Sequence, residues 1–264
     1  MANLNGDVAL VTGAAGAIGY EICRALRDAG ARVAAVDIDE SALARAVANL
    51  GGGDDIESFV ADLTDDEQTE ALPASVRDRF GALDILVNNA GARQVAPMLD
   101  ITSAAWRRTL EIDLVAPFAL SRAAIPAMIE QGRGKIVNIA SMAGLAAFRD
   151  RAAYSAAKAG LIMLTKVTAV EYGQKGIWCN AVAPGVVETP MTTSFFESED
   201  MTASIRANTP MGRWCQPEEI AQPVVFLSSR ASDYINGTVL PVDGGWTAGY
   251  AGAELSPPRI GASR

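Results

Sequence analysis

The chain has 264 residues, half of them hydrophobic, and carries 31 acidic against 22 basic side chains, for a formal net charge of −9. This balance, without any Lys- or Arg-rich run, excludes the basic face that a nucleic-acid-binding protein normally shows. There is no histidine, which removes the Ser-His-Asp triad and nearly every common zinc site, so we expect no metal.

The sequence also indicates a cellular compartment. The N-terminal stretch MANLNGDVAL lacks the basic region and apolar core of a secretory signal, and we expect no apolar stretch as long as the roughly 18 residues of a membrane helix. Cys23, Cys179 and Cys215 are odd in number and widely spaced, which fits a reducing compartment better than a disulfide framework. We therefore expect a cytoplasmic protein with no membrane partner.

Short apolar runs alternate with longer helical patterns along the chain. The runs predict seven strands, at residues 8–13, 32–37, 57–63, 84–91, 135–141, 177–185 and 237–245. The helical patterns cover residues 18–29, 40–50, 65–80, 102–131, 152–173 and 217–229. Nearly continuous apolar strands are typical of a sheet covered on both faces, and repeated strand–helix–strand units imply parallel pairing. The sequence predicts one α/β domain over residues 1–264, a doubly wound, Rossmann-like sheet of seven parallel strands.

The alternation breaks at residues 190–215, a long mixed segment without a strand pattern. Long insertions in compact domains often cover an active site, so we expect a substrate lid there. The C-terminal tail, 247–264, closes with SPPRIGASR, whose two prolines oppose regular structure.

The first strand ends in TGAAGAIG, residues 12–19, directly before a helical pattern. Gly13, Gly16 and Gly19 allow a tight turn and let a pyrophosphate approach the free N–H groups at the start of the helix. A glycine-rich turn alone is a weak signal, and its place between a strand and a helix strengthens it. The pattern predicts a dinucleotide site.

Carboxylates follow the second and third strands. Asp37 ends the second strand, where a carboxylate can accept both hydroxyls of an adenosine ribose and repel a 2′-phosphate. Asp37 could instead cap the next helix, a place that Asp39 fills equally well. After the third strand, Asp62 and Leu63 could contact an adenine, or Asp62 could cap the helix that follows.

Tyr154 and Lys158 are the two large polar residues of AAYSAAKAG (152–160), a run of small residues that favours helix. Residues four apart lie on one face of a helix, so the two side chains meet. An ammonium favours the anion of a nearby phenol, so the pair could exchange a proton near neutral pH. The alternative is an ordinary pair on a helix surface.

In combination, these motifs resemble the short-chain dehydrogenase/reductase family in its compact, single-domain form. The matching pieces are the glycine turn 12–19, NNAG (88–91), Ser141 thirteen residues before Tyr154, YSAAK (154–158), NAVAPGVVETP (180–190) and VDGG (242–245). They cover almost the whole chain in the order that the family has them. The combination is specific although no single piece is.

The resemblance implies an oxidoreductase that transfers a hydride between nicotinamide and a secondary alcohol or ketone. Tyr154 would be the general acid/base, Lys158 would hold the nicotinamide ribose and favour loss of the phenol proton, and Ser141 would hydrogen-bond the substrate oxygen. Asp37 favours NAD over NADP as the cofactor. The expected cofactor contacts are Gly13, Ala15, Gly16, Ile18, Gly19, Asp37, Asp62, Leu63, Asn89, Ala90, Gly91, Tyr154, Lys158, Pro184, Gly185, Val187 and Thr189.

Two positions depart from the family pattern. Ala17 stands where compact members usually have the middle glycine, and Gly16 comes one place earlier, a spacing like that of larger members with a separate substrate domain. Asp113 stands where the family usually has an asparagine that helps hold a water in a proton relay reaching Lys158. An ionised aspartate cannot donate a hydrogen bond. It could pair with Lys158 directly or through water, which would raise the pKa of Lys158.

The segments that usually form the family's substrate walls are 92–97, 142–153 and 190–215. They supply three arginines to an otherwise acidic protein: Arg93, Arg149 and Arg151. Arginine suits bidentate capture of a carboxylate, sulfonate or phosphate. The same arginines could instead lie on the rim and pair with Asp150 or with another subunit.

Three functions follow from these observations. The leading one is an NAD-dependent dehydrogenase of a small polar metabolite such as a sugar, polyol or sugar acid. The second is an NADPH-dependent 3-oxoacyl thioester reductase, against which Asp37 argues. The third is a dinucleotide-sensing protein without turnover, against which the intact Ser141, Tyr154 and Lys158 argue.

The two longest predicted helices also suggest an assembly. Small side chains along 102–131 and 152–173 permit close helix–helix approach, and related compact members usually pair these helices across a two-fold axis. Closed two-fold symmetry makes a homotetramer the expected state.

Overall fold

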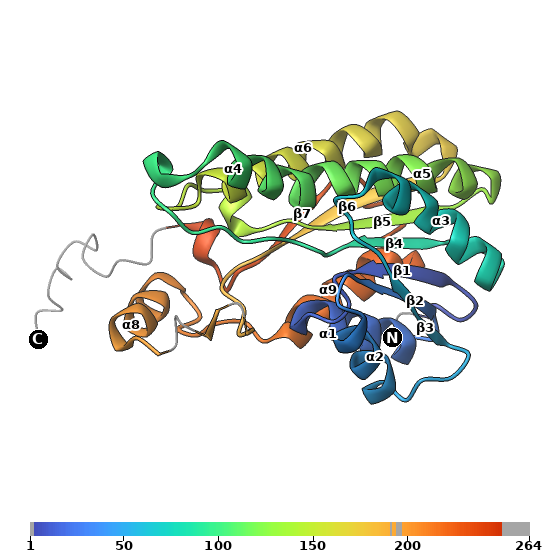
Figure 1. Ribbon diagram of the computed structural model, residues 1–264, viewed down its shortest axis with the longest axis horizontal. Helices are drawn as coiled ribbons and strands as arrows, with labels where there is room; N and C mark the ends of the chain where they lie inside the picture. The colour runs from blue at the N-terminus through green and yellow to red at the C-terminus, as the bar shows by residue number, and fades with distance from the viewer. Residues whose placement is uncertain (1–2, 191, 194–196, 250–264) are drawn as a thin grey trace, which may run out of the picture.

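The computed structural model describes residues 3–190, 192–193 and 197–249, which form a seven-stranded parallel sheet between two layers of helices (Figure 1). The strand order is β3-β2-β1-β4-β5-β6-β7. The strands are β1 (Val8–Thr12), β2 (Arg32–Asp37), β3 (Ile56–Val60), β4 (Ile85–Asn88), β5 (Gly134–Ile139), β6 (Ile177–Pro184) and β7 (Val239–Val242). This confirms the predicted doubly wound fold.

The central strands owe their place to uninterrupted apolar sequence. Every residue of β1 and β5 is buried, as expected for strands covered on both faces. Leu10 of β1 lies opposite Ala34 of β2 on one side and Leu86 of β4 on the other. The predicted fourth strand, 84–91, is too long, because the chain leaves the ladder after Asn88 and turns into the NNAG segment.

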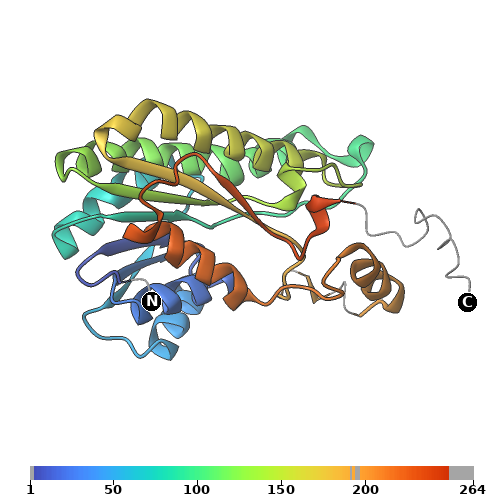
Figure 2. The same cartoon turned by 180° about the vertical axis from the view of Figure 1, so that it is seen from behind.

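Helices cover both faces of the sheet. α1 (Ala17–Asp28), α2 (Glu40–Asn49) and α9 (Pro217–Ser228) pack on one face, where Figure 2 shows α9 beneath β6 and β7. α3 (Asp66–Phe80), α5 (Ala116–Glu130) and α6 (Ala152–Tyr172) pack on the other. Ile22, Leu26 and Val224 belong to the first apolar core, and Val76 and Met128 to the second.

The single helix predicted over 102–131 is interrupted. α4 (Ser103–Leu110) runs into a π-helical turn, Glu111–Val115, before α5 begins. Such a turn holds one extra residue and is frequent at functional sites. Here it buries Asp113 completely.

The same stretch also corrects the expectation about membranes. Ser103–Glu130 is long and apolar enough, by length and composition alone, to cross a membrane. More than half of its most apolar window is buried inside the protein. The stretch therefore behaves as a core helix of this fold.

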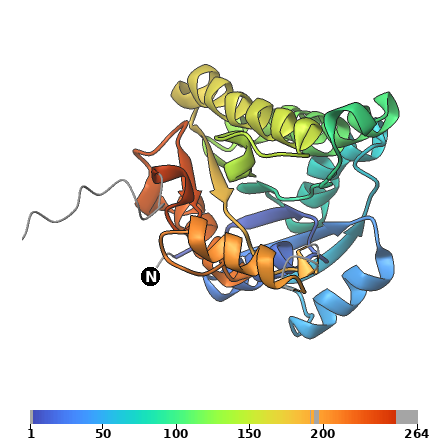
Figure 3. The same ribbon diagram turned by 90° about the vertical axis from the view of Figure 1, so that its left-hand side faces the viewer.

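The long segment 190–215 contains a helix that the sequence pattern did not predict, α8 (Glu199–Asn208). Its N-terminus is capped by Ser198, whose side chain accepts a hydrogen bond from the backbone N–H of Met201. In Figure 3, α8 lies in front of the carboxyl ends of the strands. Part of the segment, and the tail from residue 250 onward, lie outside the described residues.

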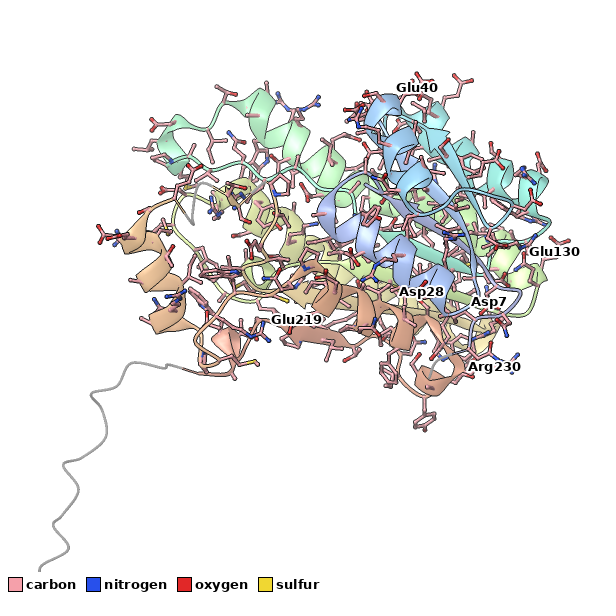
Figure 4. The ribbon with its side chains drawn as sticks, turned by 90° about the horizontal axis from the view of Figure 1, so that it is seen from below. Asp7, Asp28, Glu40, Glu130, Glu219 and Arg230 are labelled. Atoms are coloured by element: carbon pink, nitrogen blue, oxygen red, sulfur yellow. The ribbon has the colours of Figure 1, made fainter. Side chains whose placement is uncertain are left out.

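Charged residues gather at the opposite, amino ends of the strands. Asp7 and Arg230 lie there in Figure 4, far from α8. The Asp84 carboxylate accepts a hydrogen bond from the backbone N–H of Val8 at 2.9 Å, and Lys135 pairs with Asp233 at 2.8 Å. This network ties the amino ends together and leaves the carboxyl ends open for a site.

Candidate active site

Two adjoining cavities lie at the carboxyl ends of the strands, the edge that faces the viewer in Figure 3. The first, of about 530 Å³, lies over the glycine turn and the ends of β2 and β3. The second, of about 330 Å³, lies over the ends of β5 and β6 and reaches α8. Ile18, Asn89, Gly91 and Thr189 line both.

The two cavities collect every residue that the sequence predicted for the site. The dinucleotide cavity, as we call the first, is lined by Gly13, Ala15, Gly16, Gly19, Asp37, Asp62, Leu63 and Ala90. The substrate cavity, as we call the second, is lined by Arg93, Asp113, Ser141, Arg149, Arg151, Tyr154, Lys158, Pro184, Gly185 and Val187. These residues lie far apart in the sequence and meet at the edge of the sheet where the strands have their carboxyl ends.

The glycine turn fits close against the strand that precedes it. Gly13 has a φ of +66°, a left-handed conformation that favours glycine. A Cβ added at Gly19 would lie 2.1 Å from the Gly13 carbonyl oxygen, so a side chain there would push α1 away. The Asn89 amide donates hydrogen bonds to the Thr12 carbonyl at 2.8 Å and the Gly13 carbonyl at 3.2 Å. The NNAG segment is thereby tied to the turn.

The two carboxylates in the dinucleotide cavity do not serve as helix caps. Asp39, not Asp37, caps α2 by accepting a hydrogen bond from Ala42 N. Asp37 instead accepts hydrogen bonds from Ala15 N at 3.0 Å and Asp39 N at 3.2 Å. Its carboxylate is thus fixed beside the glycine turn.

Asp62, the carboxylate that follows the third strand, is likewise not a helix cap. Asp65, not Asp62, caps α3. Asp62 accepts hydrogen bonds from the backbone N–H and the hydroxyl of Thr64, and both lower the pKa of Asp62. Asp62 and its neighbour Leu63 therefore remain at the cavity wall.

The dinucleotide cavity has the features that a dinucleotide requires. Within the described residues, no side chain caps α1 at Gly16, so the N–H groups at its start are available to a phosphate. Asp37, the last residue of β2, lines the same cavity with its carboxylate held beside the turn. Ala17, the departure from the family pattern, lines the cavity with its methyl group, and the turn keeps its glycines on both sides.

Lys158 is buried in contact with an anion. Its Nζ lies 2.9 Å from Asp113 Oδ1 and donates a hydrogen bond to the Ile139 carbonyl at 2.9 Å. Asp113 Oδ2 accepts a hydrogen bond from Ala92 N at 3.0 Å. Burial favours a lower pKa for Lys158, but attraction to Asp113 and Tyr154 outweighs it, and the pKa of Lys158 is raised. The pairing with Asp113 is direct, and Lys158 stays charged.

The alternative of a surface pair for Tyr154 and Lys158 is wrong, because Lys158 is only 3% exposed. Its Nζ lies 5.7 Å from the centre of the Tyr154 ring. Ser141 follows β5, and its Oγ accepts a hydrogen bond from Ala143 N at 3.1 Å. A hydroxyl that accepts through a lone pair keeps its own proton for donation.

The three arginines differ in their surroundings. Arg149 is exposed, whereas Arg93 and Arg151 are half-buried. Burial and then the like charge of Arg151 lower the pKa of Arg93. Burial lowers the pKa of Arg151 against the attraction of Tyr154 and Asp150. Arg93 and Arg151 therefore belong to the wall of the cavity, and Arg149 lies at its rim.

Several wall residues were not singled out from the sequence, although Phe148 lies in the expected wall segment 142–153. Phe148 and Trp246 line the substrate cavity with ring centres 5.9 Å apart. Arg108 lines the dinucleotide cavity from α4 and attracts Asp62. Trp246 comes directly after VDGG, which is a positional signal, but nothing in the sequence shows which face of α4 the cavity meets.

Known proteins match this chain over nearly its full length. A family model described as enoyl-(acyl carrier protein) reductase matches residues 13–247. The cis-4-hydroxycyclohexanecarboxylate dehydrogenase of Sinomonas cyclohexanicum is 41% identical over 242 residues, 91% of this chain and 96% of that protein. The chain belongs to the short-chain dehydrogenase/reductase family.

Other members of the family are nearly as similar. The D-threitol dehydrogenase of Mycolicibacterium smegmatis is 39% identical over 92% of this chain and 94% of its own. A crystal structure of a gluconate 5-dehydrogenase from Beutenbergia cavernae, described as NAD(P)-dependent and solved with bound NADP at low occupancy, superposes with a TM-score of 0.88. It is 39% identical and covers 94% of this chain and 99% of that one. Membership makes this chain an oxidoreductase that binds a nicotinamide dinucleotide and acts on a small molecule.

Proposed function

We propose that the protein is an NAD-dependent dehydrogenase of the secondary alcohol of a small polar metabolite, a sugar, polyol or sugar acid. One observation carries the proposal: Ser141, Tyr154 and the charged Lys158 line one small cavity that adjoins a dinucleotide cavity. Relatives named for a cyclic hydroxy acid, a polyol and gluconate support the substrate class.

The chain's own residues manage the proton and the charge. When bound, the nicotinamide supplies or accepts the hydride. Tyr154 takes the hydroxyl proton of an alcohol, or returns one to a ketone oxygen. Ser141 donates a hydrogen bond to the same oxygen and stabilises negative charge that develops there. Lys158 holds positive charge beside the phenol, and Asp113 keeps Lys158 charged and in place.

The same residues would hold the cofactor in two groups. The glycine turn and the start of α1 would hold the phosphates, Asp37 the adenosine ribose, and Asp62 and Leu63 the adenine. Lys158 and Tyr154 would hold the nicotinamide ribose. Pro184, Gly185, Val187 and Thr189 would hold the carboxamide side.

Asp37 supports NAD over NADP, because its fixed carboxylate would repel a 2′-phosphate. Arg108 is the one described cation that lines this cavity, and it attracts Asp62. Its charge is thus partly compensated before any phosphate arrives.

The test is a screen of secondary alcohols with NAD and NADP, followed at the absorbance of the reduced cofactor. We expect kcat/KM to be higher with NAD, and Asp37→Ala to weaken that preference. A preference of the parent for NADP would contradict the cofactor assignment.

Tyr154→Phe should nearly abolish turnover and leave the affinity for NADH, measured by calorimetry, within about threefold of the parent, because cofactor contacts are spread over many residues. Tyr234→Phe, at a fully exposed tyrosine, is the matched control and should keep full activity.

A second candidate is a 3-oxoacyl thioester reductase, which two relatives favour: the 3-oxoacyl-[acyl-carrier-protein] reductases of Thermotoga maritima and Vibrio cholerae, 37% and 39% identical to this chain. Acetoacetyl-CoA with NADPH tests it directly. Efficient reduction of this thioester, together with no oxidation of the small alcohols, would replace the first proposal. Turnover with any substrate excludes a purely dinucleotide-sensing role.

Two further assignments accompany the function. We propose that residues 190–215 form a lid, since Met201 and Ile205 of α8 line the substrate cavity. All three cysteines are free thiols, which supports the cytoplasm as the proposed location.

A further inference from the structure

We propose that the substrate is a small hydroxy acid with a largely apolar carbon skeleton. Its carboxylate is bound between Arg93 and Arg151, and its skeleton packs against Phe148 and Trp246. The inference rests on the proposed dehydrogenase function and deepens it, because it names the chemistry of the substrate. Three features of the substrate cavity carry it.

The first feature is the charge of the wall. The described lining residues include four cations, Arg93, Arg149, Arg151 and Lys158, and one anion, Asp113. Asp113 pairs with Lys158 at 2.9 Å. This is a cationic cavity in a protein whose net charge is −9. An anionic substrate is attracted to such a wall, and a neutral one is not.

The second feature is how the two half-buried arginines are held. Arg93 follows the NNAG segment and Arg151 directly precedes α6. Their loops are joined by a hydrogen bond from Ala96 N to the Asp150 carbonyl at 3.1 Å. Both guanidiniums lie within electrostatic reach of Tyr154, and Arg93 also feels Arg151. Arginine stays protonated even when burial opposes it. A carboxylate bound between them would therefore relieve a repulsion and lie close to the reacting alcohol.

The third feature is that the carboxylate and amide side chains of the described lining already have partners. Among the described lining residues, the carboxylate and amide side chains are those of Asp113 and Asn89. Asp113 is engaged with Lys158 and Ala92 N, and Asn89 donates to the Thr12 and Gly13 carbonyls. The further hydroxyls of a sugar acid would therefore have to pair with hydroxyl side chains such as those of Thr189 and Ser204, and each one left unpaired is costly.

The wall opposite these polar groups is apolar. Phe148 and Trp246 pack at 5.9 Å with an interplanar angle of 53°, and Met142 and Ile205 extend the surface they form. Their side chains come from the loop after β5, the turn after β7, and α8. A ring or a short aliphatic chain buries its CH groups there favourably.

The chemistry at the alcohol is unchanged by this assignment. The carbinol C–H bond breaks and its electron pair leaves with the hydrogen to NAD, the oxidant of the proposed function. The hydroxyl proton passes to Tyr154, and the alcohol carbon becomes a ketone. The carboxylate gains and loses nothing, and serves to orient the carbinol toward Tyr154.

The test compares four probes that vary one property at a time. 3-Hydroxycyclohexanecarboxylate and 4-hydroxycyclohexanecarboxylate carry both the charge and the apolar ring, cyclohexanol lacks the charge, and gluconate lacks the apolar ring. We expect kcat/KM for the better cyclic hydroxy acid to exceed that for cyclohexanol by roughly 100-fold, the size of a good charge-assisted pair. The same kcat/KM should exceed that for gluconate by at least about tenfold.

Variants assign the effect to the two arginines. Arg93→Gln and Arg151→Gln should each lower the ratio of kcat/KM for the hydroxy acid to kcat/KM for cyclohexanol by about 10- to 100-fold. Arg151→Lys, which keeps the charge and loses the planar fork, should restore part of the loss. Arg45→Gln, at an exposed arginine of α2, is the matched control and should leave kcat/KM for both substrates unchanged.

A binding measurement separates this inference from the proposed function. Cyclohexanecarboxylate and cyclohexanecarboxamide cannot be oxidised, so calorimetry with the NADH-loaded protein reads recognition alone. We expect the carboxylate to bind and the amide to bind at least about tenfold more weakly, with the difference lost in Arg151→Gln. Phe148→Ala should also lower the affinity for cyclohexanecarboxylate.

The outcomes distinguish the two proposals. If cyclohexanol is oxidised as well as the hydroxy acids, the dehydrogenase stands and the anionic substrate is wrong. If gluconate is preferred over both cyclic acids, the apolar skeleton is wrong. If no alcohol is oxidised but the carboxylate binds selectively through Arg151, the proposed dehydrogenase is wrong and the anion site stands.

Discussion

Asp113 makes two contacts that no other side chain of its size can make together. One carboxylate oxygen meets Lys158 at 2.9 Å and the other accepts from Ala92 N at 3.0 Å. An asparagine has one accepting oxygen and an NH₂ group that would face a second donor. The family's usual asparagine therefore cannot be placed here without losing one of the two contacts.

Asp113→Asn should keep turnover but move the pH profile of alcohol oxidation. Removing the anion takes away the attraction that raises the pKa of Lys158 and favours loss of a proton from the Tyr154–Lys158 pair. The rising limb of kcat/KM against pH is expected to shift to lower pH. Asp78→Asn, at an exposed position of α3, is the control. An unchanged profile would show that the charge of Asp113 does not act on the pair.

Among the elements, α1 depends most on the absence of a side chain. Gly19 lies so close to the Gly13 carbonyl that a Cβ would come within 2.1 Å of it. At Gly16, which is exposed, the same construction gives 3.3 Å. The two glycines of the turn therefore have different tasks, since Gly19 sets the packing of α1 and Gly16 leaves room at its N-terminus.

Gly19→Ala should destabilise the protein by about 1–3 kcal/mol, the usual cost of forcing an extra carbon into a packed site. Gly16→Ala is the matched control and should change the free energy of unfolding by less than about 1 kcal/mol. Urea unfolding without cofactor measures both variants. Equal effects of the two substitutions would contradict the assignment of Gly19 to packing.

The start of α9 is held by a charged pair that crosses to the end of the lid segment. Arg213 donates two hydrogen bonds of 2.7 Å to Glu219, which also accepts from Gln216 N at 2.9 Å. These contacts lower the pKa of Glu219 to about 2. Figure 4 shows Glu219 at this junction.

Because the folded-state pKa of Glu219 is lowered, the stability it contributes is present above its ordinary value of 4.5 and is lost as the pH falls toward about 2. The difference in Tm between the parent and Glu219→Gln should therefore be full at pH 6 and shrink steadily between pH 4.5 and 2. Glu218→Gln, one residue away on the exposed side, controls for the loss of a charge. A difference that stays constant over this range would rule out the pair as its source.

At the scale of the whole molecule, sequence reasoning reached the fold because strand and helix periods are local. β1 reads VALVT and is buried along its whole length, so its pattern and its environment agree. The turn at Asp113 breaks this agreement, since a π-helical turn has no composition of its own. Phe148 and Trp246 meet only through the tertiary fold, and the different burial of Arg149 and Arg151 depends on where α6 begins.

The outer face of the α5–α6 layer leaves apolar side chains exposed. Met163, Val167 and Val170 follow one another at helical spacing on α6 and are 57%, 43% and 86% exposed, and Phe118 of α5 is 46% exposed. An apolar stripe of this kind marks an interaction surface. It supports the proposed homotetramer, in which this face would meet its copy across a two-fold axis.

Light scattering coupled to gel filtration should give a mass near four chains at micromolar concentration. Val170→Asp should lower that mass, because a carboxylate buried at a two-fold axis would meet its own copy. Tyr234→Asp, at another fully exposed position, should not. A monomeric parent would defeat the proposal, and a tetrameric Val170→Asp would place the interface elsewhere.

The π-helical turn at 111–115 has a consequence for how the chain can change by insertion and deletion. The turn holds one residue more than an ordinary helical turn. The buried positions of α4 and those of α5 therefore do not follow one continuous helical spacing, but are offset by one residue. Deleting a single residue would let the turn close into an ordinary helix, with α4 and α5 still facing their present neighbours. The carboxylate would no longer reach Lys158. The loss of one codon would thus keep the scaffold intact. It would remove the Asp113 carboxylate from Lys158, which has no other buried carboxylate partner among the described residues.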